Sequence, residues 1–130
     1  MLISEAFKTF NATLNNIQWS VSAINSDNEL VLSLWEHFFE KRSKGTMTYT
    51  DSASRWSGAG NNEFRKNFQQ AYEDNLKVRA IIAKSKKPDV ITEGGSGANL
   101  GNTFHPKSTW IGKITQWDGD NFEIEFTQEK

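Results

Sequence analysis

The sequence predicts an α+β domain: a mostly antiparallel sheet, or a partly closed barrel, of about six short strands with two helices. Three observations lead to this prediction. Apolar residues alternate with polar ones in several short segments bounded by turn residues, which is typical of strands. In two segments they recur every three or four residues, which is typical of helices. The pair Asp118-Gly119 joins two alternating segments and indicates an antiparallel hairpin.

The predicted elements follow the order α-β-β-β-α-β-β-β in a single domain covering residues 1–130. A chain of 130 residues has the size of one domain, and no repeat or linker divides it. Ser4 is the expected N-cap of the first helix, because its hydroxyl can accept a hydrogen bond from a free N–H of the first turn. Phe7, Phe10 and Leu14 share one face of this helix.

An antiparallel hairpin is expected next. Residues 17–24 alternate with a period of two, residues 25–28 are turn-forming, and residues 29–35 continue as a strand that can extend to Phe39. A helix over residues 31–41 is the alternative, since a short apolar run does not distinguish a strand from a helix. Trp19 and Trp35 lie on the two strands of this hairpin, where they can pair.

The middle of the chain predicts a strand, a loop and a helix. Residues 41–45 form a basic turn, and residues 46–50 are rich in β-branched side chains, which favours a third strand. A loop over residues 51–60 then leads to a helix capped by Asn61 or Asn62. The spacing that predicts this helix is carried by Phe64, Phe68, Ala71 and Tyr72.

Three further strands are predicted after this helix. Residues 76–83 form the first, with Lys77 and Arg79 on one face. Residues 84–102 form a long glycine-containing connector, and loops of this length are typically mobile or functional. The Asp-Gly turn joins the last two strands, residues 110–117 and 121–126.

Composition excludes several classes of protein. The chain has no cysteine, which excludes disulfides, thiolate catalysis and cysteine-ligated zinc. Two prolines and 12% aromatic residues exclude a collagen-like or disordered chain. We expect no membrane association, because no apolar run approaches the ~18 residues of a membrane span. The absence of a leader pattern and of cysteine predicts a cytoplasmic location.

Charge is distributed unevenly along the chain despite a net charge of −1. Residues 41–87 contain eleven basic and four acidic residues, whereas the segments on either side are acidic. Clustered cations attract phosphate groups and release their condensed counterions. This pattern predicts a basic surface if the fold gathers these cations. The alternative is that carboxylates from the two ends of the chain neutralise them through ordinary surface pairs.

The loop at residues 54–62 is the second candidate feature. Its small residues lead into a predicted helix N-terminus, where free N–H groups and the helix dipole favour an anion. Arg55 precedes this point, and Arg65 and Lys66 are expected in the first helical turn. Trp56 offers a flat face for a base or sugar. The alternative is an ordinary capping loop in which Trp56 packs on the core.

Catalytic and metal-binding patterns are weak in this sequence. His37 and His105 are its two histidines and lack ligand spacing, so we expect no metal site and no cofactor. The nucleophile-elbow pattern Gly-x-Ser-x-Gly does not occur. An enzyme using carboxylate and histidine chemistry around Glu36, His37 and His105 is therefore the least favoured interpretation.

The sequence favours a non-catalytic binding module that presents a basic and aromatic surface to nucleic acid or a phosphorylated ligand. The alternative is a protein, homodimeric by expectation, that binds a small molecule or a protein partner through tryptophan-lined pockets. The arginines and lysines would hold phosphates and the tryptophan would stack. The candidate ligand-binding residues are Arg55, Trp56, Arg65, Lys66, Lys77 and Arg79.

Overall fold

The computed structural model describes residues 1–92, 94 and 102–128. These residues form three α-helices, eight strands and two short 3₁₀ turns. In chain order the elements are α1 (Ile3–Lys8), β1 (Ser22–Ile24), β2 (Leu30–Trp35), η1 (Glu36–Phe38), β3 (Phe39–Ser43), β4 (Thr46–Ser52), η2 (Ala53–Arg55), α2 (Ala59–Glu73), β5 (Val78–Lys84), α3 (Pro88–Thr92), β6 (Thr103–Pro106), β7 (Trp110–Trp117) and β8 (Asn121–Gln128).

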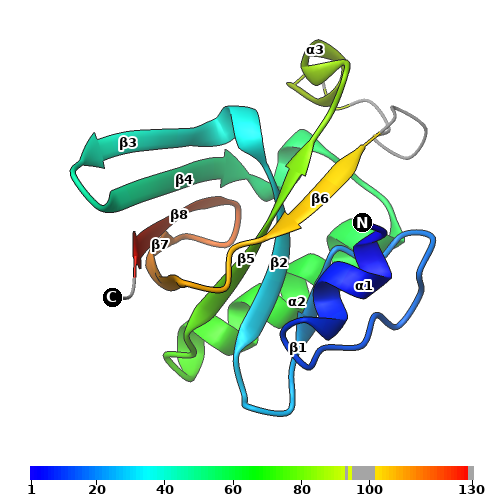
Figure 1. Cartoon of the computed structure of the whole chain (residues 1–130), viewed down its shortest axis with the longest axis horizontal. Helices are drawn as coiled ribbons and strands as arrows, with labels where there is room; N and C mark the ends of the chain where they lie inside the picture. Colours follow the sequence, from blue (N-terminus) through cyan, green and yellow to red (C-terminus); the bar gives the residue numbers. More distant parts are fainter. Residues whose placement is uncertain (93, 95–101, 129–130) are drawn as a thin grey trace.

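All the strands belong to one mixed, mostly antiparallel sheet with the order β1-β2-β5-β7-β8-β4-β3, and β6 pairs with the far half of β5 (Figure 1). Only β2 and β5 run parallel among the described strands. The predicted α+β class and antiparallel sheet are confirmed. The predicted counts were too low, because the 3₁₀ turn η1 separates β3 from β2, because α3 lies in the predicted connector and because β6 follows it. The sheet is open between β1 and β3, so the barrel alternative is wrong.

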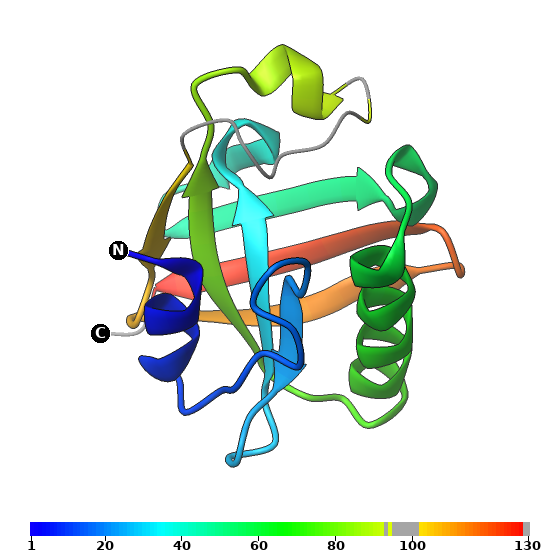
Figure 2. The same cartoon turned by 90° about the vertical axis from the view of Figure 1, so that its right-hand side faces the viewer.

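The sheet bends sharply where β5 meets β7. Strands β4, β7 and β8 run across the direction of β2 and β5, and α2 stands along one side of the molecule (Figure 2). Val78 and Gly112 form the one register pair that joins β5 to β7 among the described residues. The bend creates a concave side that α2 covers.

Two apolar clusters stabilise the fold, one on each face of the β2–β5 pair. The larger cluster lies on the concave side, where Phe64, Phe68 and Ala71 of α2 contact β2, β4, β7 and β8. The smaller one packs Phe7 of α1 and the chain after it against Val31 and Ile81. Strands β2 and β5 are therefore apolar on both faces, which is typical of a parallel pair buried on both sides.

The first helix is shorter than the spacing predicts. Leu2, and not Ser4, is its N-cap, and the Glu5 carboxylate accepts the Leu2 N–H. The helix ends at Lys8 because Asn11 adopts a left-handed conformation (φ 57°) and turns the chain. Phe10 and Leu14 are buried as expected, although they follow the helix and do not belong to it.

The first strand is also shorter than predicted. Residues 17–21 precede β1, because Asn16 organises them into a turn: its side chain accepts the Gln18 N–H and its carbonyl accepts the Ser20 N–H. Ile17 is 69% exposed, so the alternation at this point did not indicate a buried face. Hydrogen bonding by a side chain to nearby backbone here overrides the apolar pattern.

Of the remaining predictions about secondary structure, most are confirmed and one is wrong. The β1–β2 hairpin, the strand now seen as β5, the helix α2 and the Asp118-Gly119 hairpin are confirmed. The helix over residues 31–41 is wrong, since these residues form β2, η1 and part of β3. The predicted connector contains α3 and leads to β6, and its residues 93 and 95–101 lie outside the described part of the chain.

Candidate functional site

A cavity of about 840 Å³ lies beside the second half of β2. β1 pairs only with the first half of β2, from Leu30 to Leu32 in the register. Beyond that point Ser33, Leu34 and Trp35 have no strand on this side in the described structure, and the cavity opens there. Residues 17–21 and 55–60 form its other walls. Its volume is in the range of small-molecule sites, about 300–1,000 Å³.

Aromatic side chains supply much of the cavity wall. Three of the five tryptophans line it, together with a tyrosine and phenylalanines from the larger apolar cluster. Trp56 is fixed by an edge contact with Phe64 at 5.8 Å between ring centroids. Trp19 and Trp35, which were predicted to pair across a hairpin, both line this cavity. Trp19 is 40% exposed. The aromatic lining includes Trp19, Trp35, Tyr49, Trp56, Phe64 and Phe122.

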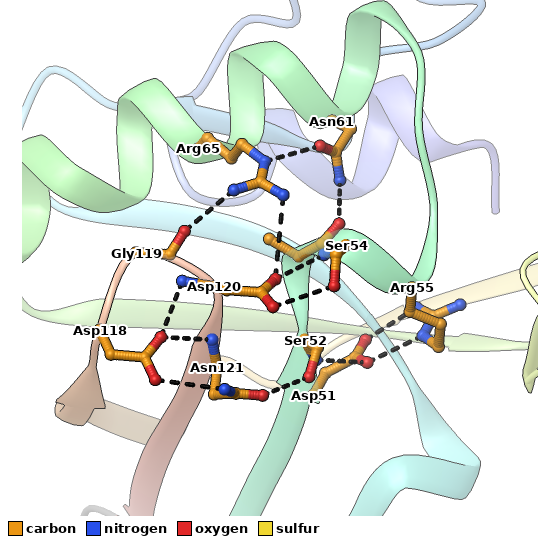
Figure 3. Close-up of polar contacts among 11 residues, drawn as sticks. Asp51, Ser52, Ser54, Arg55, Asn61, Arg65, Asp118, Gly119, Asp120 and Asn121 are labelled. Atoms are coloured by element: carbon orange, nitrogen blue, oxygen red, sulfur yellow. Dashed lines mark hydrogen bonds and ion pairs between the residues drawn. The ribbon is translucent and has the colours of Figure 1, made fainter.

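A nearly buried ion pair joins two of the residues that line the cavity, Asp51 and Arg55 (Figure 3). Arg55 Nε donates to Asp51 Oδ1 at 2.8 Å, and Arg55 Nη2 donates to Asp51 Oδ2 at 2.7 Å. The side chains are 15% and 6% exposed, respectively. Arg55 Nη1 also donates to the Ile91 carbonyl of α3 at 2.7 Å. This two-point geometry fixes the plane of the guanidinium.

Tyr49 reaches the same cavity from β4. Tyr49 and Asp51 are two residues apart on one strand and therefore point to the same face. The Tyr49 ring is buried, and its hydroxyl oxygen accepts the Trp35 N–H at 3.4 Å. Burial, followed by the charge of Asp51, raises the pKa of Tyr49 well above its ordinary value. The hydroxyl is therefore a neutral hydrogen-bond donor at all physiological pH values.

The turn between β7 and β8 holds the segment that carries Arg55 (Figure 3). Asp120 accepts the backbone N–H of Ser54 at 2.7 Å and the Ser54 hydroxyl at 3.0 Å. Asn61 of α2 donates its amide to the Ala53 carbonyl at 2.7 Å. Arg65 donates to Asn61 and to the Gly119 carbonyl. These contacts join three elements and position Arg55 and Trp56 at the cavity.

His37 is exposed and lies near enough to Arg55 and Asp51 for their charges to act on it. Partial burial, followed by the Arg55 charge, lowers its pKa, while Asp51, Asp89 and Glu36 oppose that shift. His37 Nε2 is hydrogen-bonded to Thr92 and His105 Nε2 to Thr103, so the two histidines have different partners. No group of three or more His, Asp or Glu side chains within residues 1–92, 94 and 102–128 is arranged to hold a metal ion.

The six residues predicted to bind ligand do not gather on one surface. Arg55 and Trp56 both line the cavity. Arg65 contacts the β7–β8 turn, and Arg79 contacts Glu29, the Ser108 carbonyl and the Phe10 ring. Lys66 on α2 and Lys77 before β5 are exposed.

Several basic side chains of residues 41–87 lie next to carboxylates from other parts of the chain. Arg79 pairs with Glu29 at 3.6 Å and Lys84 with Glu36 at 3.2 Å. Arg65 approaches Asp120 at 3.8 Å. The acidic ends of the chain thus contribute partners to its basic middle, which weakens the local field of the cations.

The helix N-terminus differs from the predicted anion site. Gly58, with a φ of 111°, is the N-cap of α2, so Asn61 and Asn62 are both inside the helix. Because α2 begins at Ala59, Arg65 and Lys66 both lie beyond its first turn, where they were predicted. Gly60 allows the helix to approach the Trp19 carbonyl, where a Cβ atom would clash. The glycines of this loop therefore serve turn geometry and close packing.

Sequence reasoning missed Asp51, Tyr49 and Ser33 at the cavity. A usable signal was present for the first of these. Asp51 precedes Arg55 by four residues, a spacing that allows an ion pair. The two side chains meet only because the chain changes from β4 to the 3₁₀ turn η2 between them. The sequence carried no signal for Ser33, because this residue lines the cavity only as a result of where β1 ends.

Comparison of the chain with protein-family models, curated proteins and solved structures finds no match in any of the three. Within the described residues no helix has the length and apolar character needed to cross a membrane.

Proposed function

We propose that this protein is a non-catalytic binding protein that holds a small molecule in the aromatic cavity. The observation that carries the proposal is the cavity itself: about 840 Å³ lined by indole and phenyl rings, with a fixed ion pair in its wall. Protein interiors are normally close-packed, because unfilled space forfeits dispersion contacts. A hollow lined by aromatic side chains with few oriented polar groups is the usual composition of a ligand site.

The position of the polar groups supports binding over catalysis. Arg55 and Asp51 satisfy each other at 2.7–2.8 Å, so neither is a free nucleophile or general base. The Tyr49 hydroxyl is neutral, and His37 bonds to Thr92. A rigid, mutually satisfied pair can orient a ligand without exchanging protons with it.

The proposal is tested by thermal denaturation against a panel of small planar and non-planar compounds. We expect specific compounds to raise the Tm, because a ligand that binds only the folded state stabilises it by mass action. Ser33→Phe places a ring in the cavity and should abolish the shift. Thr50→Phe, an exposed position on β4, is the matched control and should retain it. A panel without effect, or an equal response in Ser33→Phe, would refute the proposal.

Nucleic-acid or phosphate binding remains the second candidate for Lys66 and Lys77, which are exposed and basic. A labelled single-stranded oligonucleotide and a duplex, titrated at two salt concentrations, test this directly. Several phosphate contacts should make affinity fall steeply with salt. Absence of binding at low salt would leave the cavity as the binding site.

A further inference from the structure

We infer that the ligand of the aromatic cavity is an uncharged, flat heteroaromatic compound that carries carbonyl or ring-nitrogen acceptors. The inference rests on the proposed function and specifies the chemistry of its ligand. Three properties of the cavity support it: its balance of charge, the direction of its free hydrogen-bonding groups, and the shape of its apolar walls.

The charge balance favours an uncharged ligand. Among the described residues that line the cavity, Asp51 and Arg55 are the two with charged side chains, and they neutralise each other. An anion in this cavity would lose its hydration without meeting an unpaired cation, and burying an uncompensated charge is strongly unfavourable. A cation would meet the same difficulty, because the Asp51 carboxylate is already paired. A neutral ligand avoids both costs.

Two of the side chains that line the cavity, Arg55 and Tyr49, have N–H or O–H donors left over. A guanidinium has five N–H bonds, and three of those on Arg55 are directed at Asp51 and the Ile91 carbonyl. The other two have no acceptor in the described part of the chain. The Tyr49 oxygen accepts from Trp35, and its own proton likewise lacks an acceptor within the described residues. These donors are complementary to a ligand that carries acceptor atoms.

The apolar walls favour a flat ligand. Trp19, Trp35 and Trp56 all line the cavity, and an indole face stacks with any planar π system. The cavity is also large enough for a bicyclic or tricyclic ring. Indole rings that can stack and donors that lack a partner together favour a flat ring that carries acceptor atoms.

Matched pairs of compounds test the inference on the full chain by quenching of tryptophan fluorescence and by calorimetry. The pairs are nicotinamide with nicotinate, indole-3-acetamide with indole-3-acetate, and riboflavin with its 5′-phosphate. In each pair the ring is kept and a negative charge is added. We expect at least one neutral member to bind at least about tenfold more tightly than its anion, the ratio for a charge-burial cost of about 1.4 kcal/mol.

A variant of the donor provides the second arm. Tyr49→Phe removes one hydroxyl from a buried ring, and it should weaken binding of the neutral member about fivefold, the scale of one hydrogen bond. Thr50→Ala, on the outward face of the same strand, should leave affinity unchanged.

The outcomes separate the two proposals. Equal or tighter binding of the anions, or an unchanged affinity in Tyr49→Phe, overturns the inference and leaves the proposed function standing. If none of the six compounds binds, the inference falls, while the broader panel against Ser33→Phe still decides the proposed function.

Discussion

Gly112 and Phe126 face each other across β7 and β8, and the Phe126 ring lies directly over the glycine. A Cβ atom on Gly112 would clash with two carbons of that ring and crowd a third. Gly112 is also the residue that pairs with Val78 at the bend of the sheet. A single missing side chain thus allows an aromatic ring to cover the corner where the two parts of the sheet meet.

Gly112→Ala should therefore destabilise the protein. The added methyl forces the Phe126 ring to move in a close-packed cluster, which typically costs about 1–3 kcal/mol. Urea denaturation measures the change. Phe126→Leu in the same chain frees space over residue 112, so the double variant should lose less than the sum of the two single losses. Strictly additive losses would contradict the steric explanation.

Asp51→Asn should be strongly destabilising. It leaves the Arg55 guanidinium, 15% exposed, without its carboxylate, and breaking a buried pair typically costs about 3–5 kcal/mol. Chemical denaturation measures the loss. The double variant Asp51→Asn with Arg55→Met removes both charges and should recover part of the stability. A double variant no more stable than Asp51→Asn would show that the pair is not the source of the effect.

Two aromatic residues of α2 should respond differently to truncation. Phe68 is fully buried against Trp117 and Phe122, so Phe68→Ala should cost about 3–5 kcal/mol. Tyr72 is 43% exposed, and Tyr72→Ala should cost less than about 1 kcal/mol. Thermal and urea unfolding of the two variants provide the comparison. Similar losses at both positions would contradict the orientation of α2.

His37 should make stability depend on pH in the mildly acidic range. Its pKa is lowered in the folded protein, first by burial and then by Arg55, so the unfolded chain binds the proton more readily. The contribution of His37 is complete above the unfolded pKa of about 6.5 and is lost as the pH falls below it. The charges around it are Arg55, Asp51, Asp89 and Glu36.

Replacement of this histidine tests the sign. In His37→Gln the urea midpoint should decrease less than in the unmodified protein when the pH is lowered from 7 to below 6.5. Steeper loss of stability in the variant would mean that the folded state favours the protonated imidazole.

Asp120→Ala should loosen the segment that carries the ion pair. The variant removes the acceptor of the Ser54 N–H and hydroxyl, and we expect a loss of about 1–3 kcal/mol. The Arg65 contact at 3.8 Å is half-exposed and adds little. Hydrogen exchange should become faster at residues 53–56. Unchanged exchange there would show that α2 alone holds this turn.

The confirmed parts of the fold are those governed by local pattern. The Asp118-Gly119 turn fixes its hairpin, and the spacing from Phe64 to Ala71 fixes the buried face of α2. The failures occur where a side chain competes with the pattern. Asn16 bonds to nearby backbone and shortens the first strand, and Asn11 turns the chain and ends the first helix. Such bonds depend on geometry that periodicity does not contain.

The candidate site was only partly predictable for a related reason. Arg55 and Trp56 were identified because a small-residue loop leads into a helix. Their neighbours Tyr49 and Ser33 come from separate strands, and the parallel pairing of β2 with β5 sets the sheet order that places those strands. Charge counting along the chain overlooked carboxylates such as Glu29, which the fold brings to Arg79. Proximity in space was the missing information.

The pairing of β2 with β5 also affects the order in which the protein can assemble. Leu30 meets Val78 in this ladder, so β2 gains its second neighbour only after β3, β4 and α2 have been synthesised. Contacts between distant parts of a chain form slowly. A nascent chain that ends before β5 therefore leaves an apolar strand with one open edge, and at this stage the polypeptide is most prone to associate with other chains.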